Sequence, residues 1–140
     1  MRGACRCGQV NYQVKSQPLY SGYCHCHACQ KRNSAPCVSL FLIQKSQIDI
    51  NGNTATYHSK GGSGKDLIEH RCDSCGDALY SDITVLDGVI VFLASTLDNP
   101  ADFKPEGHLW VSSRDPRFDI NDDLEQQAGP PMQMMPYLAK

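Results

Sequence analysis

Two short cysteine motifs, far apart along the chain, are the most informative part of the sequence. Residues 5–8 are Cys-Arg-Cys-Gly, and residues 72–76 are Cys-Asp-Ser-Cys-Gly. In each motif a glycine directly follows the second cysteine, where the backbone can turn tightly around a metal-bound sulfur. A tetrahedral zinc site needs four ligands, and these two pairs supply them. We therefore predict a structural zinc that joins the start of the chain to its middle, held by Cys5, Cys7, Cys72 and Cys75.

The alternative for these four residues is disulfides or free thiols. Disulfides inside a CxC or CxxC motif would close very small loops, which remove little entropy from the unfolded chain. The N-terminal segment 1–5 has no hydrophobic stretch typical of a secretory signal, and eight cysteines without such a signal favour metal. No apolar run approaches the roughly 18 to 20 residues of a membrane span. We expect a soluble, cytoplasmic protein.

A third cysteine group lies between the two motifs. Residues 24–29 are Cys-His-Cys-His-Ala-Cys, so three thiols of one short loop, Cys24, Cys26 and Cys29, can face one ion. Such a loop leaves the fourth position of a tetrahedral zinc open, and an open position distinguishes catalytic from structural zinc. We predict a catalytic zinc here, and hence two zinc ions per chain.

The alternative for the third group is a closed site completed by Cys37. This cysteine directly follows Pro36 and opens the apolar run 37–43, which favours a small buried residue at the start of a strand instead. His25 and His27 alternate with the cysteines, so in an extended loop they point away from the sulfurs. We expect them beside the ligands or on the surface.

The remaining sequence predicts a mainly β, single-domain protein. The 140 residues suffice for one domain, and short apolar or alternating runs are separated by turn residues. We place the domain at 1–128 and a Pro- and Met-rich tail, either docked or mobile, at 129–140. A helical turn is expected over Gln30–Asn33, before Pro36. The expected strands are Gln9–Val14, Cys37–Ile43, Gln47–Ile50, Thr54–His58, Asp66–Cys72, Ala78–Asp82, Val89–Ala94 and His108–Ser112.

Charge limits the kinds of partner. Thirteen Lys and Arg against fifteen Asp and Glu give a formal charge of −2, without the basic excess of a nucleic-acid binder. The cations nearest the cysteine groups could receive a substrate carboxylate; they are Lys31, Arg32, Lys60, Lys65 and Arg71. Trp110 and His108 alternate on the last expected strand. Core packing is the default for Trp110, and a pocket wall is the alternative.

The order of these motifs resembles the glutathione-dependent formaldehyde-activating enzyme family, which includes centromere protein V type domains. The resemblance spans about residues 3–125 and rests on segments 5–12, 24–32, 72–76, 96–98 and 105–110. It implies a β-tent of short, mostly antiparallel sheets stapled by zinc. It also implies a structural zinc on Cys5, Cys7, Cys72 and Cys75, and a catalytic zinc on Cys24, Cys26 and Cys29.

The family reaction implied by the resemblance joins formaldehyde to the sulfur of glutathione, giving S-hydroxymethylglutathione. In reverse it is a carbon–sulfur lyase reaction. Our leading hypothesis is a zinc-dependent enzyme that acts on such a thiol adduct, with a small thiol such as glutathione and an aldehyde as partners. The competing hypothesis is a zinc-stabilised binding module with two structural metal sites and no catalysis.

Overall fold

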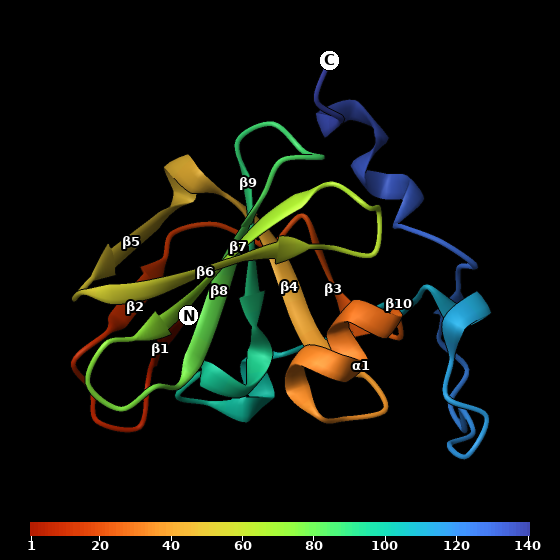
Figure 1. Cartoon of the computed structure of the whole chain (residues 1–140), viewed down its shortest axis with the longest axis horizontal. Helices are drawn as coiled ribbons and strands as arrows, with labels where there is room; N and C mark the ends of the chain where they lie inside the picture. The colour runs from red at the N-terminus through yellow and green to blue at the C-terminus, as the bar shows by residue number, and fades with distance from the viewer.

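The computed structural model describes residues 1–140, and eleven short strands are its main regular elements (Figure 1). The strands are β1 (Arg2–Ala4), β2 (Asn11–Val14), β3 (Tyr20–Cys24), β4 (Val38–Gln44), β5 (Ile48–Asn51), β6 (Thr54–Lys60), β7 (Asp66–Cys72), β8 (Ala78–Ile83), β9 (Val89–Leu93), β10 (Gly107–Leu109) and β11 (Glu125–Gln126). The expectation of a mainly β protein is confirmed.

The helical segments are few and short. The α-helix α1 (His27–Asn33) follows β3 directly. Four single 3-10 turns lie between strands and a longer 3-10 segment lies in the tail; they are η1 (Lys45–Gln47), η2 (Ala94–Thr96), η3 (Pro100–Asp102), η4 (Val111–Ser113) and, in the tail, η5 (Met132–Tyr137). No helix has both the length and the apolar character to cross a membrane.

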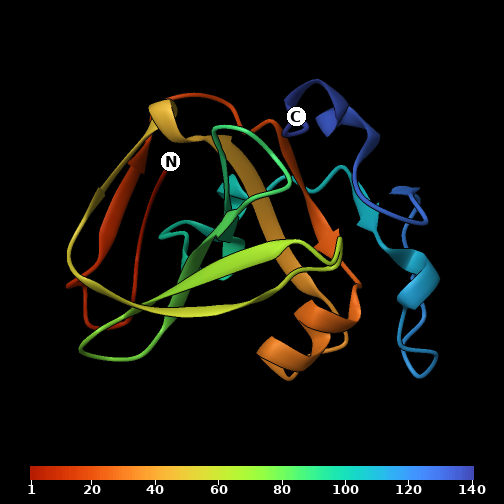
Figure 2. The same ribbon diagram turned by 45° about the horizontal axis from the view of Figure 1, so that its top comes forward.

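The strands form a small sheet and a large one. The small sheet has the order β1-β2-β5, and the large sheet has the order β11-β10-β3-β4-β9-β8-β7-β6. Most neighbours are antiparallel, as expected, but β10 runs parallel to both β3 and β11. Figure 2 shows the β6–β7 hairpin crossing the molecule, so that its connecting loop reaches towards the end of β3 and α1.

Strand β4 has both faces covered, which explains its continuous apolar sequence. Successive side chains of a strand point to opposite faces. Phe41 and Ile43 contribute to a core shared with the small sheet, where they meet Tyr12. Leu40 and Leu42 belong to a second apolar cluster, which also contains the three cysteines of the 24–29 loop. One strand therefore separates the core that holds the fold from the side that carries the candidate site.

Three strands, β1, β3 and the two-residue β11, escaped the sequence prediction. Strands β1 and β3 each contain a glycine. In both strands the glycine is needed because another part of the chain lies very close to it, and not because the backbone turns there. A Cβ on Gly3 would lie 2.2 Å from the hydroxyl oxygen of Tyr12, and one on Gly22 would lie 2.4 Å from the carbonyl oxygen of Gly107. Glycine lowers strand propensity in sequence, although here it permits close pairing.

Two predicted elements have different bounds. The helical turn expected at Gln30–Asn33 is the second half of α1, which begins at His27. The strand expected at His108–Ser112 was wrong beyond Leu109, because Trp110 takes a left-handed conformation (φ 56°) and starts η4. A residue in the left-handed conformation cannot continue a strand, because strand residues need extended backbone angles.

The C-terminal tail is docked on the domain. The backbone N–H of Asp87 donates to the carbonyl of Tyr137 at 2.7 Å, and that of Ala139 donates to the carbonyl of Val85 at 3.0 Å. Met134, which lies in η5 just before these anchors, is only 2% exposed. Of the two alternatives for residues 129–140, the structure has the docked one.

Candidate active site and metal clusters

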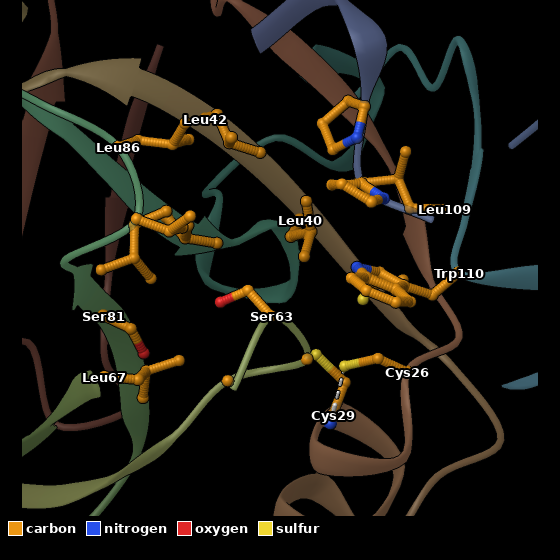
Figure 3. Close-up of a pocket in the computed structure, with 18 of the residues that line it drawn as sticks. Cys26, Cys29, Leu40, Leu42, Ser63, Leu67, Ser81, Leu86, Leu109 and Trp110 are labelled. Carbon is orange, nitrogen blue, oxygen red and sulfur yellow. Dashed lines mark hydrogen bonds between the residues drawn. The ribbon is translucent and has the colours of Figure 1, made fainter. Parts of the chain in front are cut away.

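The three cysteines of the 24–29 loop converge because strand and helix meet there. Cys24 ends β3, Cys26 caps the N-terminus of α1, and Cys29 lies in the helix. The backbone N–H of Cys29 donates to Sγ of Cys26 at 3.3 Å, as an N-cap requires (Figure 3). All three side chains are buried, and their sulfur atoms lie within 4.8 Å of one another.

Crowding shifts the pKa values of these thiols in opposite directions. Hydrogen bonds from the thiols of Cys24 and Cys29 lower the pKa of the Cys26 thiol far below its ordinary value. Interactions with Cys26 and Cys29, together with burial, raise the pKa of the Cys24 thiol. The protein alone thus favours one thiolate over three. All three thiols can ionise together when they bind a metal cation, because its positive charge offsets their negative charges.

Cys37 belongs to neither cysteine cluster. It is half-buried, one residue before β4, and burial raises the pKa of its thiol. The binding-module hypothesis needed a fourth sulfur to close the second site, and Cys37 does not join the three that converge there.

Neither histidine of the loop joins the three-cysteine cluster, in line with their alternation with the cysteines. His27 is exposed. His25 is buried, and its Nε2 lies 2.8 Å from Nδ1 of His108, whose own Nε2 lies 2.9 Å from a carboxylate oxygen of Asp122. Burial, followed by the nearby His108, lowers the pKa of His25. This chain of three polar groups joins the loop to β10 and to Asp122, which no sequence motif singled out.

A cavity of about 220 Å³ opens beside the three cysteines. Figure 3 shows Cys26 and Cys29 at one end of it, with Leu40 and Leu42 of β4 and Leu86 extending away from the sulfurs. Aliphatic side chains from the large sheet, the β8–β9 connection and the tail supply most of its wall. The candidate site therefore combines a thiol cluster with an apolar chamber.

Trp110 lines this cavity and also packs against the second apolar cluster. It is half-buried, and Figure 3 shows its ring beside the sulfur of Cys26. A Cβ added to Gly62 of the β6–β7 loop would lie 3.0 Å from Cβ of Cys26 and 3.3 Å from the Trp110 ring. The default expectation of core packing and the alternative of a pocket wall therefore each describe part of the surroundings of Trp110.

Of the five cations singled out in the sequence, Arg32 lies nearest to the site. Its Nη2 is 3.8 Å from Sγ of Cys29, and its Nε is 3.0 Å from Glu69, a carboxylate that is only 6% exposed. Arg71 also pairs with Glu69. Lys65 lines the cavity as well, whereas Lys60 pairs with Asp66 and Lys31 is exposed. The sequence prediction missed Glu69, which holds Arg32 in place.

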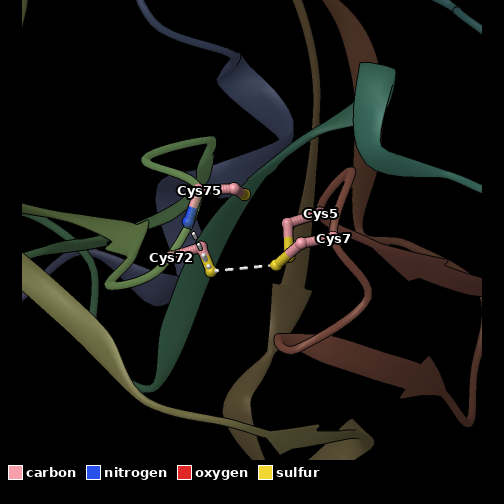
Figure 4. A group of neighbouring side chains, drawn as sticks. All are labelled: Cys5, Cys7, Cys72 and Cys75. Atoms are coloured by element: carbon pink, nitrogen blue, oxygen red, sulfur yellow. Dashed lines mark hydrogen bonds between the residues drawn. The ribbon is translucent and has the colours of Figure 1, made fainter.

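The other four cysteines form a second cluster at the opposite core (Figure 4). The sulfur atoms of Cys5, Cys7, Cys72 and Cys75 lie within 4.8 Å of one another. Gly8 and Gly76, which follow the two pairs, have φ values of 78° and 79°. These left-handed conformations turn the chain back beneath the sulfurs, as the motifs predict.

Polar contacts join the two halves of this four-cysteine cluster. The backbone N–H and the Nε of Arg6 each donate to the carboxylate of Asp77 at 2.8 Å. These hydrogen bonds lower the pKa of the Asp77 carboxyl. At the cluster, burial opposes ionisation of Cys5, but the N–H of Val10 and the neighbouring thiols lower its pKa to about 6. Asp77 was not singled out from the sequence. Its position directly after the second cysteine motif was the one feature that could have indicated its role.

Both clusters have the donor chemistry of a zinc site. Thiolates are soft ligands that zinc prefers, four in closed sites and three where a position stays open. Closely grouped cysteines with no disulfide among them fit that requirement. The groupings predicted from sequence are the ones that the fold brings together. The clusters could hold metal ions, and zinc is consistent with them.

The fold and site define a cysteine-rich, mainly β domain with two candidate metal clusters, one of which opens into a cavity. More particularly, the chain belongs to the glutathione-dependent formaldehyde-activating enzyme family, whose model matches residues 1–113. Membership supports a glutathione-related, formaldehyde-activating function. The match ends before the tail that completes the cavity wall.

The comparison with solved structures supports the fold and does not bear on function. A Rhodobacter sphaeroides protein, a Northeast Structural Genomics target known from its crystal structure, is similar with a TM-score of 0.55 and 21% identity. The similarity covers 73% of this chain and 94% of that one. No curated protein sequence matches this chain.

Proposed function

We propose that this protein is an enzyme that joins a thiol to an aldehyde carbon, or cleaves the adduct, beside Cys24, Cys26 and Cys29. The family reaction, formation of S-hydroxymethylglutathione, is the reference case, and its reverse is a carbon–sulfur lyase reaction. The observation that carries the proposal is the convergence of three thiols, with no fourth cysteine, at the end of a cavity.

We assign a catalytic zinc to Cys24, Cys26 and Cys29, and a structural zinc to Cys5, Cys7, Cys72 and Cys75. When bound at the three-cysteine site, zinc supplies a Lewis acid that lowers the pKa of a substrate thiol or polarises an aldehyde oxygen. The four-cysteine cluster supplies all four ligands of a tetrahedral zinc from the protein, which leaves no position for a substrate.

The chain's own residues position and protect the reacting groups. Arg32 places a positive charge beside Cys29, and Glu69 fixes its orientation. Negative charge that develops on a substrate sulfur or oxygen at this end of the cavity is therefore stabilised. Trp110 and the β6–β7 loop at Gly62 cover Cys26 and limit the access of water.

In the proposed reaction one carbon–sulfur bond forms and the carbonyl π bond breaks. The thiol loses its proton, sulfur attacks the aldehyde carbon, and the carbonyl oxygen takes up a proton, so no redox partner is needed. We place this reaction in the cytoplasm, where thiols such as the eight free cysteines of this chain remain reduced.

The test is acceleration of adduct exchange. Carbon-13 formaldehyde and glutathione equilibrate with S-hydroxymethylglutathione without a catalyst, and exchange NMR measures the rate. The zinc-loaded protein should raise that rate, Cys26→Ser should remove the acceleration, and Cys37→Ala should keep it. If the loaded wild-type protein leaves the exchange rate at its spontaneous value for every thiol supplied, the proposed activity is wrong.

A further inference from the structure

The walls of the cavity identify the chemical class of its ligand. We propose that the sulfur-bearing substrate has an apolar body of about six to eight carbon atoms, an alkyl or aryl group, and that this body fills the chamber behind the cysteines. The thiol of such a molecule lies at Cys24, Cys26 and Cys29 while its body extends along β4. This inference rests on the proposed function and names its substrate class.

The chamber is built from aliphatic side chains on several sides. β4 contributes Leu40 and Leu42, and β9 contributes Val91 and Leu93 on the same face. Leu109, which pairs with Cys24 across β10 and β3, adds a further wall. Removing apolar area from water is the main favourable term that such walls offer a ligand.

The tail closes the chamber at the end away from the cysteines. Pro131 and Met134 line it, and Met134 is almost fully buried there. Backbone hydrogen bonds from Asp87 and Ala139 hold the tail in this position. The tail lies outside residues 1–113, which the family model matches, so this wall is a feature of this chain that the family match does not cover.

The charged groups of the cavity do not suit glutathione. Glutathione carries two carboxylates and an ammonium group, each of which needs a partner when it leaves water. Arg32 is already paired with Glu69, and Asp66 is paired with Lys60. Lys65 is the only cavity cation without an ion pair, and it is exposed. The chamber could accept the sulfur of glutathione but not the rest of its polar surface.

The volume fits an apolar body of moderate size. An apolar cavity of about 150 Å³ in another protein takes up benzene. The chamber here has about 220 Å³, which exceeds what formaldehyde needs and suits a ring with a short chain or a comparable alkyl group. Cavity size and wall chemistry therefore point to the same ligand class.

A chain-length series tests the chamber without any reaction. Ethanol, 1-butanol and 1-hexanol carry no thiol, so their binding, measured by calorimetry on the intact protein, reports the apolar wall alone. Each added methylene group should lower the dissociation constant about three- to fourfold until the chamber is full. A dissociation constant that does not change with chain length would overturn the inference.

Two variants locate the binding. Met134→Asp places a carboxylate in the apolar wall and should weaken 1-hexanol binding at least tenfold. Ala139→Asp places the same group on an exposed tail position outside the cavity, and should bind 1-hexanol like wild type. Because Met134→Asp could release the tail, Ser81→Phe serves as a second variant that fills the chamber from β8. Unchanged binding in both cavity variants contradicts the assignment.

Reaction rates then separate the inference from the proposed function. With formaldehyde, 1-hexanethiol should be used at least tenfold more efficiently than glutathione or 2-mercaptoethanol. If glutathione is preferred, the substrate class is wrong but the proposed carbon–sulfur chemistry stands. If no thiol reacts while the alcohols bind with the expected chain-length dependence, the proposed function fails and the apolar ligand class remains supported.

Discussion

The two cysteine clusters use the same donor atom but differ in what surrounds them. The four-cysteine cluster joins two glycine turns over a packed core, and polar contacts between Arg6 and Asp77 tie its halves together. The three-cysteine cluster joins a strand to a helix and borders a cavity. Both clusters consist of cysteines, so the residue type does not distinguish them. A site that holds the fold differs from one that can act on a substrate in its number of sulfurs and in the space beside them.

The largest effect should follow from breaking the four-cysteine cluster. Cys72→Ser removes one ligand of a closed site, and apparent binding energies of structural zinc are about 10 to 16 kcal/mol in small peptides. We expect loss of soluble, folded protein, measured by the yield and by circular dichroism. The same measurements on wild type after removal of metal by a chelator should show unfolding as well. A folded Cys72→Ser protein would mean that this cluster does not staple the fold.

Breaking the three-cysteine cluster should spare the fold. Cys26→Ser removes one zinc ligand but keeps a helix cap, because serine is itself a good N-cap, so the cost in stability should not exceed about 1 kcal/mol. We expect a folded protein that has lost catalysis. Native mass spectrometry should count two zinc ions in wild type and one in the variant. If this variant unfolds as readily as Cys72→Ser, the contrast between the two clusters disappears.

A smaller effect is expected at the turns that carry the four cysteines. Gly76 has a φ of 79° with no atom near the position of a Cβ, so Gly76→Ala adds backbone strain without a clash. The cost should be about 1 kcal/mol, read from the denaturant midpoint. Gly129→Ala is the matched control, since Gly129 is equally open but lacks a positive φ. Equal midpoints for the two variants would contradict this account of the turns.

The smallest effect should come from the cysteine outside both clusters. Cys37→Ala removes a half-buried thiol that contacts neither group of sulfurs. We expect an unchanged zinc count, unchanged thiol chemistry and a stability change below about 1 kcal/mol. A variant that loses one zinc ion would show that Cys37 closes the second site, and the binding-module hypothesis would replace the enzyme.

Local spacing predicted the cysteine groups, but it could not predict what surrounds them. The pairs with their glycines, and the alternation of His25 and His27 with the cysteines, are local geometry that a sequence displays directly. Strand β3 was missed because Gly22 makes room for Gly107, more than eighty residues away. The cavity was missed for a similar reason, since its walls come from β4, the β6–β7 loop and the tail.

Single residues show the same limit at the site. Glu69 looks like any polar residue of a strand, and only the fold reveals that it is buried between Arg32 and Arg71. Trp110 was expected in the core because aromatic residues usually pack there, but the sequence did not show that it also lines the cavity, and its left-handed backbone has no signature in the neighbouring residues. Tertiary packing determines where such side chains lie, and a single sequence does not show which residues pack together.

The distance between the clustered cysteines along the chain also sets the order in which the clusters can assemble. Cys24, Cys26 and Cys29 lie within one strand–helix junction, whereas Cys7 and Cys72 meet across 65 residues. Closing the longer loop costs more chain entropy, so a refolding chain can collect its local sulfurs first. We expect zinc uptake during refolding to show a fast phase, removed by Cys26→Ser, before a slow phase that coincides with the appearance of the β-sheet signal. The site assigned to chemistry would then also be the first part of this protein to capture metal.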